Sequence, residues 1–470
     1  MTSQELHYLS ISEAADLISQ KRLSPVELTQ AHLDRIEATE PSLNSFITLL
    51  SGDALASART AESEIQTGNY RGPLHGIPIG LKDLYYTKGI LTTIGSKIYR
   101  DFVPDYDATV AEKFADAGAI LMGKLQMHEF ALGATSVNPH DGPAHNPWDI
   151  DGITGGSSGG SGSAVGSGQV MGALGSDTGG SVRIPAGLCS IVGLKPTFGR
   201  VSRRGVFPLS FSLDTVGPMT RTARDAALIM NVIAGHDSRD QSSANVPDED
   251  FTASLGQSIN GMRIGIPEEF FYDIIDPEVA EAINLAAGVL SELGASVERV
   301  SIPILNHSLA ISSTILIAEA AEVHTDNLRD RPQDIGADVR GRLQTGALTS
   351  AQDYLKAQRA RTEFNRQMAE VMERYDILVA PTSAIGAPKI DQTHIEIGGR
   401  QENALSLMSR LTRPFNICGY PTATVPSGFT SSDLPIGMQI AGRPFEDATV
   451  LQVAHAYEQA TEWHNRRPPV

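Results

Sequence analysis

The sequence predicts an α/β fold, in which a layered β-sheet is covered on both faces by helices. Helical and strand signals alternate along the chain, a pattern typical of this fold class. The 470 residues, 41% hydrophobic and 20% charged, are enough to bury a large core. The length alone would suit about three domains, but no strong internal boundary divides the chain. We therefore expect one domain over residues 1–470.

Each element has its own local signal. A helix is expected after Ser24, because this capping residue is followed by Pro25 at the first helical position and a glutamate at the third. It should continue to about Ala38. A second helix should end before Gly118, since glycine favours a helix terminus. Apolar runs and helical periodicity predict strands over 77–81, 119–122, 170–174, 262–267, 296–300 and 436–440, and helices over 107–117, 277–293 and 447–460.

Two glycine- and serine-rich segments place Ser157 and Ser181 each behind a pair of glycines, with no histidine between them. Glycine permits close backbone approach, and successive amide N–H groups in such turns converge on negative charge, as an oxyanion hole requires. Residues 154–168 alone also have the composition of a flexible linker, but a linker has no need of the apolar run 170–174 that follows. The pattern therefore indicates a serine hydrolase site at the end of a strand.

A lysine and an aspartate, Lys82 and Asp83, follow the predicted strand 77–81. Most lysines are solvated surface cations. To act as a base at neutral pH, Lys82 would need its pKa lowered by about 3 units from roughly 10.4, and burial can supply such a shift. A carboxylate facing the amine would oppose the shift. We therefore expect Asp83 to point away, toward backbone donors.

With these residues identified, the chain resembles the amidase signature family. The match is dense over about residues 74–221 and continues more weakly over most of the rest. Its motifs include Asn-Pro-Trp-Asp at 146–149, Gly-Leu-Lys-Pro-Thr at 193–197 and Asp-Thr-Val-Gly-Pro-Met at 214–219. The resemblance implies a single large domain with a mixed, twisted sheet. It also implies a Ser-Ser-Lys triad, in which Ser181 is the nucleophile, Lys82 the base, and Ser157 a bridging serine on a cis peptide bond.

The resemblance implies further roles around the nucleophile. The tetrahedral oxyanion should be bound by four backbone N–H groups, those of Thr178, Gly179, Gly180 and Ser181. Asp177 and Arg183 should support this loop, although the two residues alone would equally fit an ordinary ion pair at the rim. Ser158 is expected beside the triad and Met127 in the substrate pocket. Neither a metal nor a cofactor is implied.

The implied activity is hydrolysis of a C–N amide bond through an acyl-enzyme, with esters and carbamates, including urethanes, as further candidate substrates. The pocket should draw on the stretches 305–316 and 383–409. An alternative is the glutaminase subunit of a glutamine-dependent tRNA amidotransferase, which resembles this chain over the same block. Those subunits carry an acidic residue shortly before the segment equivalent to 414–416. Here residues 407–413 contain no carboxylate and two arginines, which favours a free-standing amidase.

Two different kinds of protein would also fit parts of the pattern. Residues 155–159 match the G-x-S-x-G motif, so an α/β-hydrolase could use Ser157 or Ser158 as nucleophile. The candidate bases would be His394, His455 and His464. That motif should follow a strand directly, whereas turn formers fill residues 146–152. A binding protein that has lost catalysis is disfavoured because all three triad positions are filled.

Charge and cysteine content restrict the binding partners and the cellular compartment that we expect. The net charge of −18 argues against nucleic-acid binding and against an anionic membrane surface. Two cysteines, Cys189 and Cys418, exclude a disulfide framework, and Cys189 is expected to be a small buried residue. The start lacks a secretory signal, and no run of 18 apolar residues occurs. We expect a cytoplasmic enzyme, monomeric or homodimeric, that acts on a small molecule.

Overall fold

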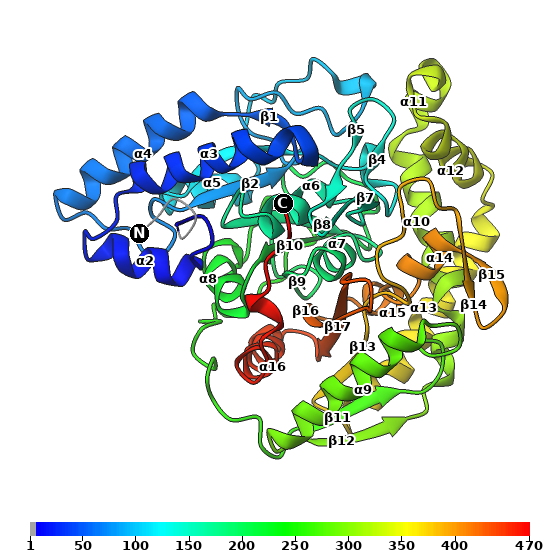
Figure 1. Ribbon diagram of the computed structural model, residues 1–470. Helices are drawn as coiled ribbons and strands as arrows, with labels where there is room; N and C mark the ends of the chain where they lie inside the picture. Colours follow the sequence, from blue (N-terminus) through cyan, green and yellow to red (C-terminus); the bar gives the residue numbers. More distant parts are fainter. Residues whose placement is uncertain (1–5) are drawn as a thin grey trace.

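Eleven strands form one mixed β-sheet with helices on both of its faces, as the computed structural model shows for residues 6–470 (Figure 1). The predicted α/β fold with a mixed sheet is confirmed. Across the sheet the strands are β1 (Phe46–Leu49), β3 (Ile120–Leu125), β2 (Pro78–Lys82), β8 (Gly172–Asp177), β10 (Thr215–Thr220), β9 (Val192–Lys195), β16 (Thr422–Phe429), β17 (Pro435–Gly442), β13 (Ile377–Pro381), β11 (Arg263–Pro267) and β12 (Ser296–Val300).

The direction of the strands determines which ends share an edge of the sheet. β2 pairs in parallel with β3 and with β8. The middle of the sheet, from β8 through β10, β9, β16 and β17 to β13, is antiparallel, and β11 is parallel to β12 and β13. Because β2 and β8 run in the same direction, Lys82 at the end of β2 and Asp177 at the end of β8 lie at the same edge.

The helices pack around this sheet and extend to one side of it, where α10 to α13 form a separate layer (Figure 1). They are α2 (Ile11–Ser19), α3 (Pro25–Leu43), α4 (Ser51–Gln66), α5 (Thr109–Asp116), α6 (Gly159–Gly166), α7 (Arg183–Leu188), α8 (Ala223–Ile233), α9 (Pro277–Glu292), α10 (Ser308–Val323), α11 (Thr325–Asp330), α12 (Ala337–Ala347), α13 (Ala351–Met372), α14 (Ala404–Ser409), α15 (Arg413–Ile417) and α16 (Asp447–Gln459).

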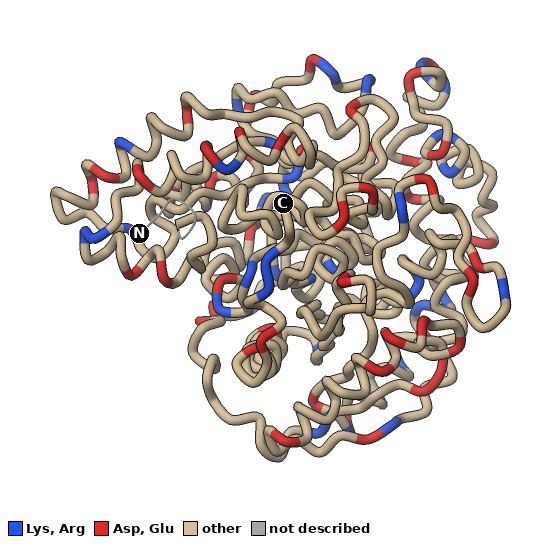
Figure 2. The backbone as a smooth tube through the Cα atoms, viewed as in Figure 1, with Lys and Arg blue, Asp and Glu red and all other residues tan. Residues whose placement is uncertain are grey.

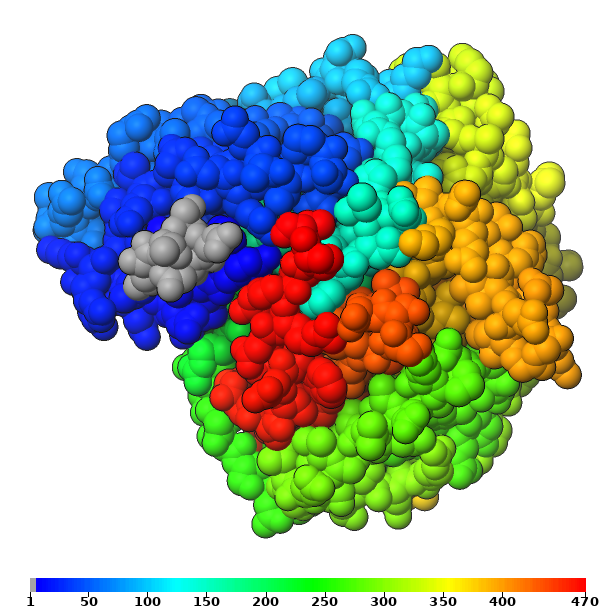
Figure 3. Space-filling model, viewed as in Figure 1, coloured from blue at the N-terminus to red at the C-terminus, as the bar shows by residue number. Residues whose placement is uncertain are grey.

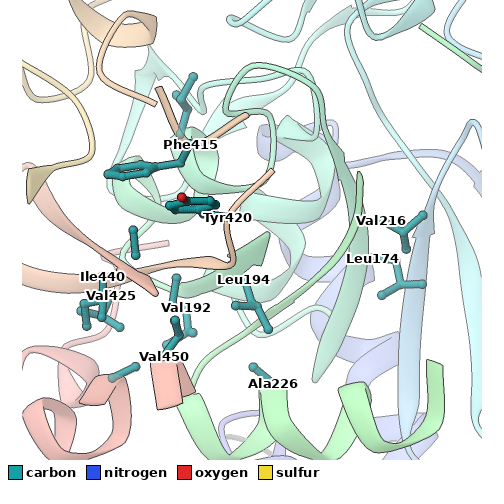
Figure 4. Close-up of a cluster of buried hydrophobic side chains, with 14 of the residues drawn as sticks. Leu174, Val192, Leu194, Val216, Ala226, Phe415, Tyr420, Val425, Ile440 and Val450 are labelled. Carbon is teal, nitrogen blue, oxygen red and sulfur yellow. The ribbon is translucent and has the colours of Figure 1, made fainter. Parts of the chain in front are cut away.

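The apolar core lies on both faces of the sheet, since successive side chains of a strand point in opposite directions. In β8, Ala173 packs in one cluster with Ala164 of α6 and Ala186 of α7. Its neighbour Leu174 belongs to the other cluster, with Ala226 of α8. Figure 4 shows Leu174, Val216, Leu194 and Val192 above Ala226 and Val450, between the sheet and helices α8 and α16.

Most of the helix and strand ends predicted from the sequence lie close to the observed ones. Ser24 caps α3 by accepting hydrogen bonds from the backbone N–H groups of Val26 and Glu27, but the helix continues past Ala38 to Leu43. The strand expected over 170–174 is shifted, because β8 begins at Gly172 and runs to Asp177. The other predicted strands and helices match observed elements to within about three residues.

Three hairpins lie outside the main sheet: β4–β5 (Val137–Asn138 and Gly142–Pro143), β6–β7 (His145–Asn146 and Asp149–Ile153) and β14–β15 (His394–Ile397 and Arg400–Asn403). A short strand, β7, therefore precedes the G-x-S-x-G motif where turn formers were expected. It pairs with β6, and its Gly152 forms an isolated bridge to Lys389, but it does not join the central sheet. The strand context of an α/β-hydrolase nucleophile is thus missing.

The C-terminal end of the chain lies against the N-terminal helices on one face of the molecule. In Figure 3 the C-terminal residues (red) lie against the N-terminal helices (blue), and Arg35 of α3 donates a hydrogen bond to the carbonyl of Val470. Charged residues of both signs are spread over helices and loops along the whole chain (Figure 2).

One helical segment within residues 6–470 is long and apolar enough to cross a membrane by length and composition. It covers Pro303–Val323, with a mean hydropathy of 1.3, and half of it is buried inside the protein. Most of this segment is α10, which packs against α12, α13 and α15. Such packing is typical of a core helix in a globular protein.

Candidate active site

The candidate site lies where β2 and β8 end and where α6 begins. Lys82 is the last residue of β2, and Ser176 is the fifth residue of its parallel neighbour β8. Ser157 comes just before α6, which starts at Gly159. Ser181 lies on the loop between β8 and α7. Three separate elements therefore bring the sequence-predicted triad residues to one edge of the sheet.

Lys82 is fully buried and contacts two hydroxyl groups. Its Nζ donates hydrogen bonds to Ser157 Oγ at 2.7 Å and to Ser176 Oγ at 2.8 Å. Burial lowers the pKa of Lys82 to about 7, although the charges of Asp214 and Asp177 act in the opposite direction. Near neutral pH about half of this amine is therefore unprotonated.

Asp83 points away from Lys82, as expected. Its Oδ2 accepts hydrogen bonds from the backbone N–H and the hydroxyl of Thr93, at 2.8 and 2.6 Å. Its other oxygen lies 3.6 Å from Nζ of Lys124, a second buried lysine. The carboxylate therefore does not hold the amine of Lys82 in its charged form.

The two predicted serines are placed differently. The Gly156–Ser157 peptide bond is cis, as the resemblance implied. Ser181 is almost buried, at 8% exposure, and lines a cavity. Its hydroxyl forms no hydrogen bond to any residue of 6–470 and is free to meet a substrate. The direct contact seen in this structure is thus the one between Lys82 and Ser157.

The loop before Ser181 presents backbone donors. The N–H of Gly180 donates to Asp177 Oδ1 at 2.8 Å and is not available to an oxyanion. The N–H groups of Thr178, Gly179 and Ser181 have no partner among the described residues, so three of the four predicted donors are free to bind an oxyanion. Gly180 has φ +124°, and a Cβ there would lie 2.0 Å from Thr412 Oγ1, so glycine is required.

Asp177 and Arg183 form a buried pair rather than an ion pair at the rim. Arg183 Nε and Nη2 each lie 3.0 Å from an oxygen of Asp177, and both side chains have zero exposure. Asn416 also donates to this carboxylate, at 2.7 Å. Burial alone would raise the pKa of Asp177, but Arg183 and Asn416 outweigh it and hold the pKa below its usual range. The pair fixes the loop that carries Ser181.

Ser158 and Ser176 lie beside the triad. Ser158 Oγ is 3.3 Å from both the carbonyl and the backbone N–H of Ser176. Sequence reasoning assigned no role to Ser176, although its hydroxyl is as close to Lys82 as that of Ser157. Its place in the Gly175-Ser176-Asp177 segment, at the end of a strand parallel to β2, was the available signal.

A cavity of about 380 Å³ opens onto Ser181. It is lined by Ala131, Leu132, Gly133, Ala134, Thr178, Gly179, Ser181, Ile184, Leu209, Leu309, Ser313, Leu316, Ile317, Arg342, Asn403, Leu405, Ser406, Ser409, Arg410 and Arg413. The stretches expected to form the pocket, 305–316 and 383–409, both contribute. Met127 does not: it is fully buried, and its carbonyl accepts from Asn138. The lining residues near it are Ala131 to Ala134.

The histidines of the alternative α/β-hydrolase lie elsewhere. None of His394, His455 and His464 is among the residues that line the cavity. His394 lies in the β14–β15 hairpin, and His455 lies on α16 next to Glu458. Within residues 6–470 no group of three or more histidine, cysteine or acidic side chains is placed to hold a metal ion.

Known proteins resemble this chain over nearly its full length. The family model described as Amidase matches residues 27–451. A glutamyl-tRNA(Gln) amidotransferase subunit of Chloroflexus aggregans is 44% identical and aligns over 99% of each chain. Seven further relatives with the same description, among them one from Moorella thermoacetica, are 40–43% identical over at least 98% of each chain.

Solved structures share the fold. One, described as "An unexpected vestigial protein complex reveals the evolutionary origins of an s-triazine catabolic enzyme", is 35% identical, with a TM-score of 0.92, and the match covers 96% of this chain and 98% of that one. A bacterial aryl acylamidase belonging to the amidase signature enzymes is 30% identical, with a TM-score of 0.90 and 98% coverage of both chains.

Proposed function

The chain belongs to the amidase signature family of hydrolases, and from this premise we propose that it hydrolyses a C–N amide bond of a small substrate through an acyl-enzyme on Ser181. The observation that carries this proposal is the buried Lys82, 2.7 Å from Ser157 Oγ, at the same edge of the sheet as the loop that carries Ser181. Ser181 itself lines the cavity. A lysine with a pKa of about 7 can accept a proton at neutral pH without a histidine.

In the proposed acylation step, Ser181 Oγ attacks the amide carbon while its proton passes to Ser157 and the proton of Ser157 passes to Lys82. The tetrahedral intermediate then collapses: the C–N bond breaks, and the departing nitrogen takes a proton back through the same relay. Water attacks the acyl-enzyme in the second half of the reaction, giving the carboxylic acid and free Ser181. Ser176, the second hydroxyl at Lys82, helps to orient the amine.

The intermediate carries negative charge on the former carbonyl oxygen. The unpartnered N–H groups of Thr178, Gly179 and Ser181 are the proposed donors to this oxygen. Each such donor typically contributes about 3 to 4 kcal/mol of transition-state stabilisation. The pair Asp177–Arg183 keeps the loop in place through the bond from Gly180 N–H to Asp177.

A second candidate is the glutaminase subunit of a glutamine-dependent tRNA amidotransferase. The curated relatives at 40–44% identity support it more strongly than they support a free-standing amidase, because all eight are described as the same subunit of glutamyl-tRNA(Gln) amidotransferase. In that case the chain would act on glutamine within a complex with other subunits. The charge of the cavity favours the free-standing type, because its lining contains no carboxylate for the amino group of glutamine.

Other expectations remain part of this proposal. The proposal includes one domain over residues 1–470, in which the family's signature motifs are densest over about 74–221. It also includes a cytoplasmic location, expected from the low cysteine content, and a monomeric or homodimeric free-standing form. Ester, carbamate and urethane hydrolysis has no support among the relatives described above, so the proposal is confined to amides.

The test is ammonia or amine release from a panel of amides, anilides and glutamine. Purified wild type should hydrolyse at least one of them, and Ser181→Ala should lose the activity. Ser161→Ala is the matched control, because Ser161 is buried on α6, bonds to the carbonyl of Leu174 and does not line the cavity. Equal activity of Ser181→Ala and wild type would refute the proposal. Co-purification of partner subunits, with turnover of glutamine alone, would favour the second candidate.

A further inference from the structure

Three arginines line the cavity at Ser181, and none of its lining residues is acidic. Arg342 comes from α12, Arg410 follows α14, and Arg413 begins α15. The remaining lining residues are apolar or uncharged. The cavity wall is therefore strongly positive in a protein whose net charge is −18.

Arg413 has no partner of its own. Its side chain forms no hydrogen bond or ion pair with residues 6–470, and its Nε is buried and unsatisfied. The guanidinium lies next to the oxyanion loop, since a Cβ on Gly179 would be 3.1 Å from Arg413 Cζ. Burial, followed by the positive charge of Arg342, lowers the pKa of Arg413 to about 10. This cation thus lies beside the loop that carries Ser181 without a hydrogen-bonded partner.

Arg342 is half-buried and lines the same cavity. Its side chain also forms no hydrogen bond or ion pair within the described residues, and it is close enough to Arg413 to repel it. Arg410 differs, because it donates to the carbonyl of Ile274 and lies over the ring of Phe270. Buried or half-buried charges are normally paired. Asp338, on the same helix as Arg342, lies close enough to interact with its charge, but Oδ2 of Asp338 is bonded to His128. Neither guanidinium group has a hydrogen-bonded counter-ion, which indicates that an anion belongs beside them in the cavity.

The carboxylate that attracts Arg413 does not fill this role. Asp177 attracts Arg413 electrostatically, but both of its oxygens are bound by Arg183, and Asn416 donates to one of them. Asp177 is fully buried behind the loop and does not line the cavity. The missing negative charge must therefore come from the ligand.

We propose that the substrate is a small amide whose non-reacting end is a carboxylate, bound by Arg413 and Arg342. This inference rests on the proposed amide hydrolysis at Ser181. A planar guanidinium fits a carboxylate with two parallel hydrogen bonds, and the cavity volume of about 380 Å³ suits a small molecule. Glutamine is a poor fit, because its ammonium group would face arginines without any lining carboxylate.

The experiment compares amides that differ only in charge. Succinamate carries a carboxylate where succinamide carries a second neutral amide. Wild type should hydrolyse succinamate with a kcat/KM about 30-fold or more above that of succinamide, because hydrogen bonds to charged groups commonly give factors of this size. Arg413→Met should remove most of this preference by raising KM for succinamate, and Arg413→Lys should retain part of it. Arg329→Met, at an exposed ion pair on α11, is the control.

Two further substrate pairs make the assignment specific. Glutaramate is glutamine without its amino group, so wild type should prefer glutaramate; a preference for glutamine would overturn the inference. N-acetylglycine carries its carboxylate on the leaving amine instead of the acyl group, and N-propylacetamide is its neutral counterpart. The substrate pair whose kcat/KM ratio falls more in Arg413→Met shows whether the acyl group or the leaving amine carries the carboxylate. Ratios near one for the succinyl and acetyl pairs alike would overturn the inference.

A binding measurement separates this inference from the proposed function. Succinate should protect Ser181 from a fluorophosphonate probe in wild type and in Arg329→Met, but about 30-fold less well in Arg413→Met and Arg342→Met. Labelling at Ser181 without protection by succinate would refute the anion site while leaving the hydrolase proposal intact. Absence of labelling, together with absence of Ser181-dependent turnover of any amide, would instead refute the proposed function.

Discussion

Replacing Lys82 by methionine should stabilise the protein, and more strongly at pH 7 than at pH 9. Methionine has a similar length but no amine, so it removes a group that is fully buried. Burial lowers the folded-state pKa of Lys82 to about 7, whereas an unfolded lysine titrates near 10.4. Between these two values the unfolded chain binds more protons than the folded one, so the stability of the wild type rises with pH in this window.

The magnitude follows from the two pKa values. At pH 7 the unfolded lysine is fully charged and the folded one about half charged, so this side chain costs the wild type about 4 kcal/mol relative to a neutral group. At pH 9 the cost falls to about 2 kcal/mol. The advantage of Lys82→Met should therefore shrink by about 2 kcal/mol over these two pH units. The loss of the bonds to Ser157 and Ser176 adds a term that does not depend on pH.

The assay is urea unfolding at pH 7, 8 and 9, followed by tryptophan fluorescence, for wild type, Lys82→Met and Lys88→Met. Lys88 is exposed, and its side chain has no hydrogen bond or ion pair with the described residues. Its replacement should leave the pH dependence of the free energy of unfolding unchanged. A difference between Lys82→Met and wild type that is the same at all three pH values would show that the amine stays charged in the folded protein. Lys82 could then not serve as the base.

Three further predictions follow from the site. The acylation rate should rise with pH through an apparent pKa near 7, and Lys82→Ala should lose this rise. The variant should slow the hydrolysis of an amide more than that of an activated ester of the same acyl group. Equal losses of rate on the two substrates would mean that the role of Lys82 is structural. Arg183→Met leaves Asp177 as a buried unpaired charge and should cost about 3 to 5 kcal/mol of unfolding free energy; a loss below 1 kcal/mol in urea titrations would contradict the buried pair. Gly180→Ala should abolish turnover, since the added Cβ clashes with Thr412. The control Gly288→Ala, in open space on α9, should keep normal turnover and add up to about 1 kcal/mol of stability. Normal turnover in both variants would refute the tight packing of Gly180 against Thr412.

The parts of the fold that the sequence predicted are those with strong local signals. The cap at Ser24 and the apolar strands on either side of the site are examples. Helix α6 could not be predicted, because glycines and serines have low helix propensity and resemble a linker. Its small residues are needed for close packing: a Cβ on Gly160 would lie 2.5 Å from the backbone of Gln126. Tertiary contacts thus override local propensity there.

The candidate site also contains residues that the sequence predicts and residues that it does not. Lys82, Ser157 and Ser181 lie in recognisable motifs, so they could be named from the sequence. Arg342 could not, because it lies on α12, in the separate helical layer, and only the folded chain brings it to the cavity. Met127 was a wrong candidate for the pocket, because its motif enters the cavity a few residues later, at Ala131.

The site of covalent modification tests most directly whether Ser181 is the nucleophile and Lys82 its base. Wild type is treated with a fluorophosphonate, digested, and analysed by mass spectrometry. We expect one adduct, on the peptide that contains Ser181. Labelling should be slower in Lys82→Ala, because the hydroxyl is no longer activated. Ser161→Ala should label like wild type. An adduct on Ser157 or Ser158 instead, or equal labelling of wild type and Lys82→Ala, would contradict the assignment of Ser181 as the nucleophile and Lys82 as its base.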